Sequence, residues 1–284
     1  MRRSFRAYEI NTGFPHPSDN TRHHKKYRRD TGSEELIDDD GALWHGAISV
    51  GTPPVSFTGS SAGHNLVGMS SSDLFLPGTL CKVNCDGHVL YDTNASSTAI
   101  SLNDTFRLSF GDGSSVYGDQ FTDTAVNQTV GAATNYSTGF SIDQFPPDGL
   151  LGMAFPEISV FGAEPFFHTL VAQNTTTAPQ FSFKLAQNGS ELFIGGVNTD
   201  LFIGPLTETP VVDTGFWQVA LDAVNVNGRA TSRNLSAIID TGTTLVLGDF
   251  ASVVKVYDNI PGAKNATNTI GEGFFTCARS TFSS

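Results

Sequence analysis

The feature that most constrains the fold is a series of short apolar runs that begins at Leu43 and is broken repeatedly by Gly, Pro and Asn. Residues 106–110 alternate between apolar and polar side chains, a Gly-rich turn follows, and a second strand-like run covers residues 116–121. Two such runs around a tight turn are typical of a β-hairpin. Helical patterns are confined to about residues 165–173 and 249–258. The sequence therefore predicts a mostly β protein.

Composition and charge exclude several classes of protein. No apolar run approaches the roughly 18 residues that a transmembrane helix needs, so we expect no membrane partner. Eight of the 16 Lys and Arg and two of the 28 Asp and Glu lie in residues 1–29, which leaves 8 basic and 26 acidic residues in the remainder. So acidic a body repels nucleic acid and anionic membranes, and we expect neither as a partner.

The basic segment at residues 1–29 has three possible interpretations: a solvated tail, a nucleic-acid arm or nuclear signal, and a prosegment that ends at Arg28–Arg29. A basic prosegment would pair with the acidic body near neutral pH and dissociate once the carboxylates are protonated. No apolar stretch follows the basic start, so we expect no signal peptide in this sequence.

Cysteines and glycosylation sequons bear on the compartment. Cys81 and Cys85 are too close together for a standard zinc site without two further ligands, so a small-loop disulfide is favoured if the chain is secreted, and Cys277 is then unpaired. The low charge and the sequons favour a secretory history, whereas the missing signal peptide opposes it. The eight Asn-X-Ser/Thr sequons begin at Asn94, Asn103, Asn127, Asn135, Asn174, Asn188, Asn234 and Asn265.

The most informative motif is Asp240-Thr-Gly-Thr243, which follows one apolar run and precedes another. A carboxylate between two buried segments is costly unless it is hydrogen-bonded, and the Gly and Thr residues can form the turn that holds it. An ordinary Asx-turn between strands is the alternative. Asp213-Thr-Gly215 is a second copy that lacks the apolar continuation, and we interpret it as a turn at a strand edge.

With these motifs in order, the chain resembles a pepsin-family aspartic endopeptidase of the fungal type from about Leu43 to Cys277. One such motif is weak, but seven in order are strong. The segments that carry the resemblance are Leu43–Pro54, Ser71–Pro77, Cys81 with Cys85 and Tyr91–Asp92, Ser109–Ser114, Asp148–Gly152, Phe216–Val219 and Asp240–Thr243.

The resemblance implies a bilobal β fold in which each lobe contributes one catalytic Asp to a shared site. It implies a basic prosegment-like tail at 1–29, an N-terminal lobe with a flap hairpin at 30–190, and an incomplete C-terminal lobe at 191–284. Asp240 would be one catalytic carboxylate, Thr241, Gly242 and Thr243 would orient it, and Cys81 would pair with Cys85. The flap would comprise Phe110, Gly111, Asp112 and Gly113. No metal or cofactor is implied; the expected protein is a secreted or vacuolar monomeric zymogen that acts on proteins or peptides.

Three departures from the family pattern bear on activity. The first Asp-Thr-Gly is missing: Gly68–Ser70 occupies its place before Ser71, and counting forward from Gly51 puts the expected Asp near Ala62 instead. Residues 41–85 contain a single acid, Asp73, which lies five residues past the catalytic position. Phe110 stands where the family's flap carries Tyr. The second lobe is expected to lack its closing strand, the counterpart of Asp148–Gly152.

Several functional hypotheses follow. The first is an endopeptidase that cleaves at acid pH between bulky apolar residues, and the second is an inactive, peptide-binding pseudo-protease. A defective reading frame would also explain the missing motif. Two further alternatives are a dimer in which each chain supplies one Asp and a β-sandwich adhesion domain.

Overall fold

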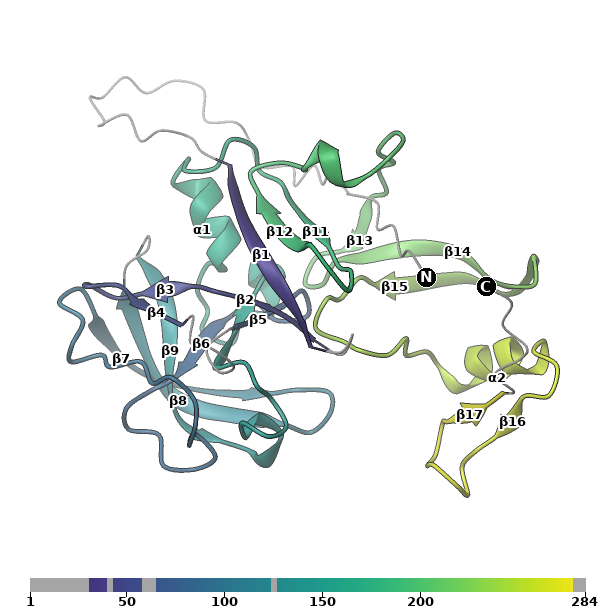
Figure 1. Ribbon diagram of the computed structural model, residues 1–284, viewed down its shortest axis with the longest axis horizontal. Coiled ribbons are helices and arrows are strands. Elements are labelled where there is room, and N and C mark those ends of the chain that lie inside the picture. Colours follow the sequence, from purple (N-terminus) through teal and green to yellow (C-terminus); the bar gives the residue numbers. More distant parts are fainter. Residues whose placement is uncertain (1–30, 40–42, 58–64, 124–126, 278–284) are drawn as a thin grey trace.

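A computed structural model describes residues 31–39, 43–57, 65–123 and 127–277. The described chain is mostly β, as the sequence predicts (Figure 1). Ten strands form one sheet in the order β11-β12-β1-β2-β5-β10-β6-β9-β8-β7. Their bounds are β1 (Gly32–Asp39), β2 (Leu43–Gly46), β5 (Asn65–Gly68), β6 (Leu74–Pro77), β7 (Ile100–Ser109), β8 (Ser115–Asp123), β9 (Gln128–Tyr136), β10 (Gly149–Gly152), β11 (Phe181–Lys184) and β12 (Ser190–Ile194).

The later part of the chain forms smaller units. A three-stranded sheet has the order β13-β14-β15, and α2 packs against its β14–β15 hairpin. In Figure 1 this hairpin extends away from the large sheet, and α2 with β16 and β17 lies at its far end. The remaining bounds are β3 (Ser49–Val50), β4 (Val55–Ser56), β13 (Val211–Asp213), β14 (Gln218–Val226), β15 (Arg229–Ile238), β16 (Lys264–Asn265), β17 (Phe275–Thr276), α1 (Phe166–Ala172) and α2 (Phe250–Asp258).

Local sequence patterns predicted several of these elements correctly. The hairpin expected around residues 106–121 is β7–β8, and the register runs from Ser109 opposite Ser115. Both expected helices are present, and Asp249 caps α2 by accepting a hydrogen bond from the backbone N–H of Ser252 at 2.9 Å. The lobe boundaries expected at residues 29/30 and 190/191 stay a prediction.

Strand β1 was not predicted from the sequence. Its residues Gly32–Asp39 are rich in Glu and Asp, which are depleted in strands, and this hides the strand from local pattern analysis. β1 pairs antiparallel with β12 on one side and with β2 on the other. These two tertiary pairings, rather than intrinsic propensity, therefore decide its conformation.

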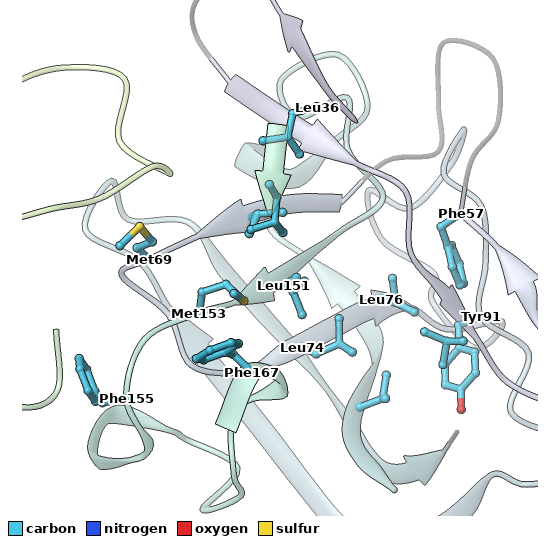
Figure 2. Packing of buried hydrophobic residues seen from close by; sticks show 14 of the residues in the cluster. Leu36, Phe57, Met69, Leu74, Leu76, Tyr91, Leu151, Met153, Phe155 and Phe167 are labelled. Atoms are coloured by element: carbon cyan, nitrogen blue, oxygen red, sulfur yellow. The ribbon is translucent and has the colours of Figure 1, made fainter. Parts of the chain in front are cut away.

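The apolar core lies where β5, β6 and β10 meet the segments around them. Leu76 and Met153 are fully buried, and Leu74 and Leu151 nearly so. Figure 2 shows these side chains together with Phe167 of α1 and Met69 of the turn after β5. Burying one such side chain contributes about 1.5–3 kcal/mol. The segment that precedes Ser71 is thus part of the core.

Trp217 joins the later part of the chain to this core. Its indole Nε1 donates a hydrogen bond to the carbonyl oxygen of Met153 at 2.8 Å, and only 6% of the residue is exposed. The ring lies 4.4 Å from Phe155 and 5.3 Å from Phe181, centroid to centroid. The residues just before β14 are therefore fixed against the segment after β10.

We expect Trp217→Phe to lower the free energy of unfolding by about 2–3 kcal/mol, because it removes apolar contact area and leaves the buried Met153 carbonyl unpaired. Urea denaturation followed by circular dichroism measures this. The matched control is Trp44→Phe, because Trp44 is less buried and its hydrogen bond to Ala186 is longer, at 3.4 Å. An equal loss in the two variants would contradict the role assigned to Trp217.

Candidate active site

The first part of the site is a loop of residues 69–73 between two strands that flank β10. β5 pairs parallel with β10, and β6 pairs antiparallel with the same strand. The backbone N–H of Met153 donates to the carbonyl of Gly68 at 2.9 Å, and that of Ala154 donates to Ser71 at 2.9 Å. β10 and the two residues that follow it thus hold this loop.

Gly152 permits this close packing. A Cβ atom at Gly152 would lie 2.5 Å from the backbone nitrogen of Asp73 and 2.5 Å from the carbonyl carbon of Ser72. Any side chain at this position would force the backbone apart, so only glycine fits here. The Gly at the end of Asp148–Gly152 is therefore required by backbone contact.

Asp148, at the start of the same segment, is a structural residue. It is fully buried, and its Oδ1 accepts a hydrogen bond from the backbone N–H of Val89 at 2.8 Å. The same oxygen lies 3.6 Å from Nδ1 of the buried His88. These contacts secure the segment that leads into β10, and they involve no residue of the Asp240 loop.

Asp240, the candidate catalytic residue, follows the end of β15 and is only partly buried. Its Oδ1 accepts hydrogen bonds from the backbone N–H groups of Gly242 at 2.9 Å and Met69 at 3.2 Å. Its Oδ2 accepts from the hydroxyl of Thr243. Three donors therefore orient one carboxylate, and one of the three belongs to the loop after β5.

Thr241 makes a second connection between the two loops. Its hydroxyl donates to the carbonyl oxygen of Val67 at 2.6 Å, across 174 positions of sequence. The Asp240 loop thus contacts Val67 and Met69, the two residues that flank Gly68. Sequence analysis did not identify these partners, because they act through backbone atoms that carry no residue signature.

Gly68 lies between these two contacts and against the Asp240 loop. A Cβ built on Gly242 would come within 3.4 Å of the Cα of Gly68. A Cβ at Gly68 itself would meet only the side chain of Leu150, at 3.8–4.0 Å, which is ordinary van der Waals contact. The position therefore has room for a Cβ atom. Ala62, the other position considered for the missing Asp, lies outside the described residues.

Asp73, the only acid between residues 41 and 85, is directed elsewhere. Its carboxylate accepts hydrogen bonds from the Ser159 hydroxyl at 2.6 Å and from the Val160 N–H at 2.9 Å. Burial raises the pKa of Asp73, and its hydrogen bonds with residues 159–161 offset this only in part. Its role is to secure the segment after β10.

The turn of the β7–β8 hairpin contains the four predicted flap residues. The Asp112 carboxylate accepts hydrogen bonds from both the backbone N–H and the hydroxyl of Ser114, at 2.9 and 2.6 Å, and Gly113 adopts a left-handed φ of 86°. Gly111, Asp112 and Gly113 are exposed. The ring of Phe110 instead lies 5.3 Å from Phe140 and 6.2 Å from Phe75, so it packs on the strand that follows the 69–73 loop.

Two further expectations concern residues away from this site. The disulfide expected between Cys81 and Cys85 is present, and Cys277 is a free cysteine. Asp213 ends β13 and is exposed, in a turn that leads to β14. Among the described residues, no group of three His, Cys, Asp or Glu side chains could hold a metal ion.

Comparisons with known proteins assign the chain to a family. The family described as eukaryotic aspartyl protease matches residues 44–284. The chain belongs to this family. It is 37% identical to an aspartic protease of Phaffia rhodozyma, over 93% of this chain and 65% of that protein. It is also similar to cathepsin E-A of Xenopus laevis, at 35% identity over 82% of this chain and 60% of the relative.

A third relative belongs to the pepsins proper. Pepsin II-1 of Oryctolagus cuniculus is 31% identical over 84% of this chain and 62% of its own length. The chain thus spans between 60% and 65% of the length of these three aspartyl proteases. In the part of the chain that the structure describes, no helix is both long and apolar enough to cross a membrane.

We expect Thr241→Val to lower the free energy of unfolding by about 1–2 kcal/mol, because it removes a hydrogen-bond donor without changing the size of the side chain. The control is Thr241→Ser, which keeps the hydroxyl and should retain most of the stability. Urea denaturation of both variants gives the comparison. If valine and serine proved equivalent, the hydrogen bond to Val67 would not stabilise the contact between the loops.

The pKa of Asp73 gives a pH-dependent prediction. Because folding raises this pKa, the stabilising contribution of Asp73 is present below the pKa of the unfolded chain and is lost as pH rises through the folded value. The stability of the parent relative to Asp73→Asn should therefore fall as pH rises above the ordinary Asp pKa of 3.8. Urea midpoints of both proteins, from below this pH to well above it, measure the fall. A difference that stays constant, or grows with pH, would contradict the assigned direction.

Proposed function

We propose that this aspartyl protease chain binds extended polypeptides at the Asp240 loop, and that hydrolysis requires a carboxylate at position 68. The observation that carries the proposal is the position of Gly68 between the two backbone groups that contact the Asp240 loop. Residues 41–72 contain no Asp or Glu, so this part of the chain offers Asp240 no second carboxylate.

The chemistry of peptide hydrolysis explains the need for two carboxylates. One group must take a proton from the attacking water while another donates a proton to the substrate carbonyl. Two adjacent carboxylates divide these roles because they cannot both ionise readily; aspartic proteases are themselves the standard example of such a pair. Asp240 with its three donors supports the role of base. Gly68 offers no acid, and losing one of two cooperating groups typically costs orders of magnitude in rate.

Peptide binding requires less than catalysis. Gly111, Asp112 and Gly113, at the turn of the β7–β8 hairpin, are exposed, so their backbone is accessible to an extended peptide. Such a peptide can be held through main-chain hydrogen bonds. The ring of Phe110 beside this turn is only partly buried, and it favours a bulky apolar side chain in the bound peptide.

The second candidate function is hydrolysis by the chain as it stands, at acid pH. It is supported by the similarity to the aspartic protease, cathepsin E-A and pepsin II-1 relatives. It needs a second carboxylate at Asp240 from outside residues 41–72, for example from a second copy of the chain.

We also propose a secretory or vacuolar location and a monomeric, zymogen-like form. The Cys81–Cys85 disulfide supports an oxidising compartment. The basic segment 1–29, which lies outside the described residues, would act as the prosegment by pairing with the acidic body until its carboxylates are protonated.

The decisive test restores the missing group. Gly68→Asp should create acid-pH cleavage of a denatured protein substrate, at least about a hundredfold above the parent, because both general acid–base roles are then filled. A statine-type inhibitor should block this cleavage, and Gly68→Asp combined with Asp240→Asn should abolish it. The measurement is peptide release at about pH 3–4, the acid range in which one carboxyl of such a dyad is protonated and the other ionised.

Two controls sharpen the test. Gly32→Asp adds the same charge on β1, at another open glycine position, and should create no activity. Fluorescence anisotropy with a labelled apolar peptide should show that the parent binds and that statine competes. Cleavage by the parent at the rate of Gly68→Asp would overturn the proposal in favour of the second candidate. If the folded parent bound no peptide, the proposed binding of extended polypeptides would be wrong.

A further inference from the structure

The eight Asn-X-Ser/Thr sequons differ from other asparagines in what their side-chain amides do. Three asparagines without a sequon use the amide nitrogen as a structural donor: Nδ2 of Asn84 donates to the Tyr136 carbonyl at 2.7 Å, and Asn198 and Asn259 donate in the same way. Among the described residues, by contrast, no sequon asparagine donates a hydrogen bond from Nδ2. Among the described contacts, the atom that would carry a glycan is therefore free at Asn103, Asn174 and Asn234.

Four of these sequons also share a backbone conformation. Asn103, Asn127, Asn174 and Asn234 are exposed and have φ values of 58°, 54°, 58° and 56°. Asn127 directly follows residues 124–126, which lie outside the described residues, whereas the other three lie within described segments. Asparagine tolerates this left-handed region better than most residues, which explains Asn but not the hydroxyl residue two positions later. Asn84 and Asn227 also have positive φ and lack that Ser or Thr. Backbone conformation alone thus does not account for the sequons.

Two of the three sites lie on the edges of sheets. Asn103 belongs to β7, at the end of the ten-stranded sheet, where the β7–β8 register shifts between Ser101 and Thr105. Asn234 belongs to β15, at the end of the three-stranded sheet. Figure 1 shows the two strands on opposite sides of the molecule. Asn174 follows the end of α1.

We propose that Asn103, Asn174 and Asn234 carry N-linked glycans, and that those at Asn103 and Asn234 block edge-to-edge pairing of the two sheets. An unpaired edge strand invites pairing with another chain, and a bulky hydrophilic group on it prevents the approach. Asn135 is the internal contrast: it lies on β9, between β6 and β8, and is only partly exposed. It should carry no glycan.

The chemistry of attachment is a group transfer without oxidation or reduction. Nδ2 of the asparagine forms a bond to the anomeric carbon of an oligosaccharide carried on a lipid diphosphate. The bond between that carbon and the diphosphate oxygen breaks, the lipid diphosphate leaves, and one amide proton is released. No sequon lies within residues 65–77, 107–119 or 238–247, the segments that contain the Asp240 loop, its contacts and the hairpin turn.

The inference rests on the proposed secretory location, and its test is independent of peptide binding and hydrolysis. The full chain is directed into the secretory pathway of a eukaryotic host by a cleavable leader, and both the intracellular membrane-enclosed pool and the secreted pool are collected. Peptide-N-glycosidase in oxygen-18 water converts each glycosylated Asn into an isotope-labelled Asp, which peptide mass spectrometry locates.

Label at Asn103, Asn174 and Asn234 but not at Asn135 is the expected result. Absence of label at those three in both pools, or equal label at Asn135, would overturn the assignment. The variants Asn103→Gly and Asn234→Gly keep the left-handed backbone and remove the glycan. Combined, they should leave the melting temperature nearly unchanged and raise aggregation several-fold by light scattering. Unchanged aggregation would overturn the role in protecting the edges.

Discussion

The contact between the Asp240 loop and residues 67–69 is the interaction on which the candidate site depends. The Met69 N–H and the Val67 carbonyl bind Asp240 and Thr241 across more than 170 positions of sequence. β10 holds residues 67–69 in place from the other side, and Gly152 allows its backbone to come close enough. Because these partners are backbone groups, the contact does not depend on which side chains stand at positions 67 and 69.

The contact therefore separates the architecture of the site from the chemistry proposed for it. The bonds that join the loops need an N–H, a carbonyl and the Thr241 hydroxyl, and none of them needs an acid at position 68. The proposed hydrolysis does need that acid, because one carboxylate cannot be both base and acid in the same step. Folding and hydrolysis therefore depend on different atoms of the same loop.

The same separation applies on the surface. The sheet edges at β7 and β15 are consequences of how the strands pair, and they are present whether or not the site is active. The sequons at Asn103 and Asn234 lie on these edges, whereas the segments around Asp240 carry none. Glycans on these edge strands would thus be attached outside the segments that form the site.

The sequence by itself determined the mostly β class, the β7–β8 hairpin, both helices and the Cys81–Cys85 pair, and it singled out Asp240–Thr243 as the candidate site. These follow from local periodicity, turn residues and short motifs, whose physical causes act over a few positions. Only the tertiary structure decided that the acidic segment Gly32–Asp39 becomes a strand, since pairing with β12 and β2 overrides its weak propensity. The structure also placed Gly68 beside the Asp240 loop and directed Asp73 toward Ser159. Hydrogen bonds between segments distant in sequence decide both placements, and no local residue pattern predicts such bonds.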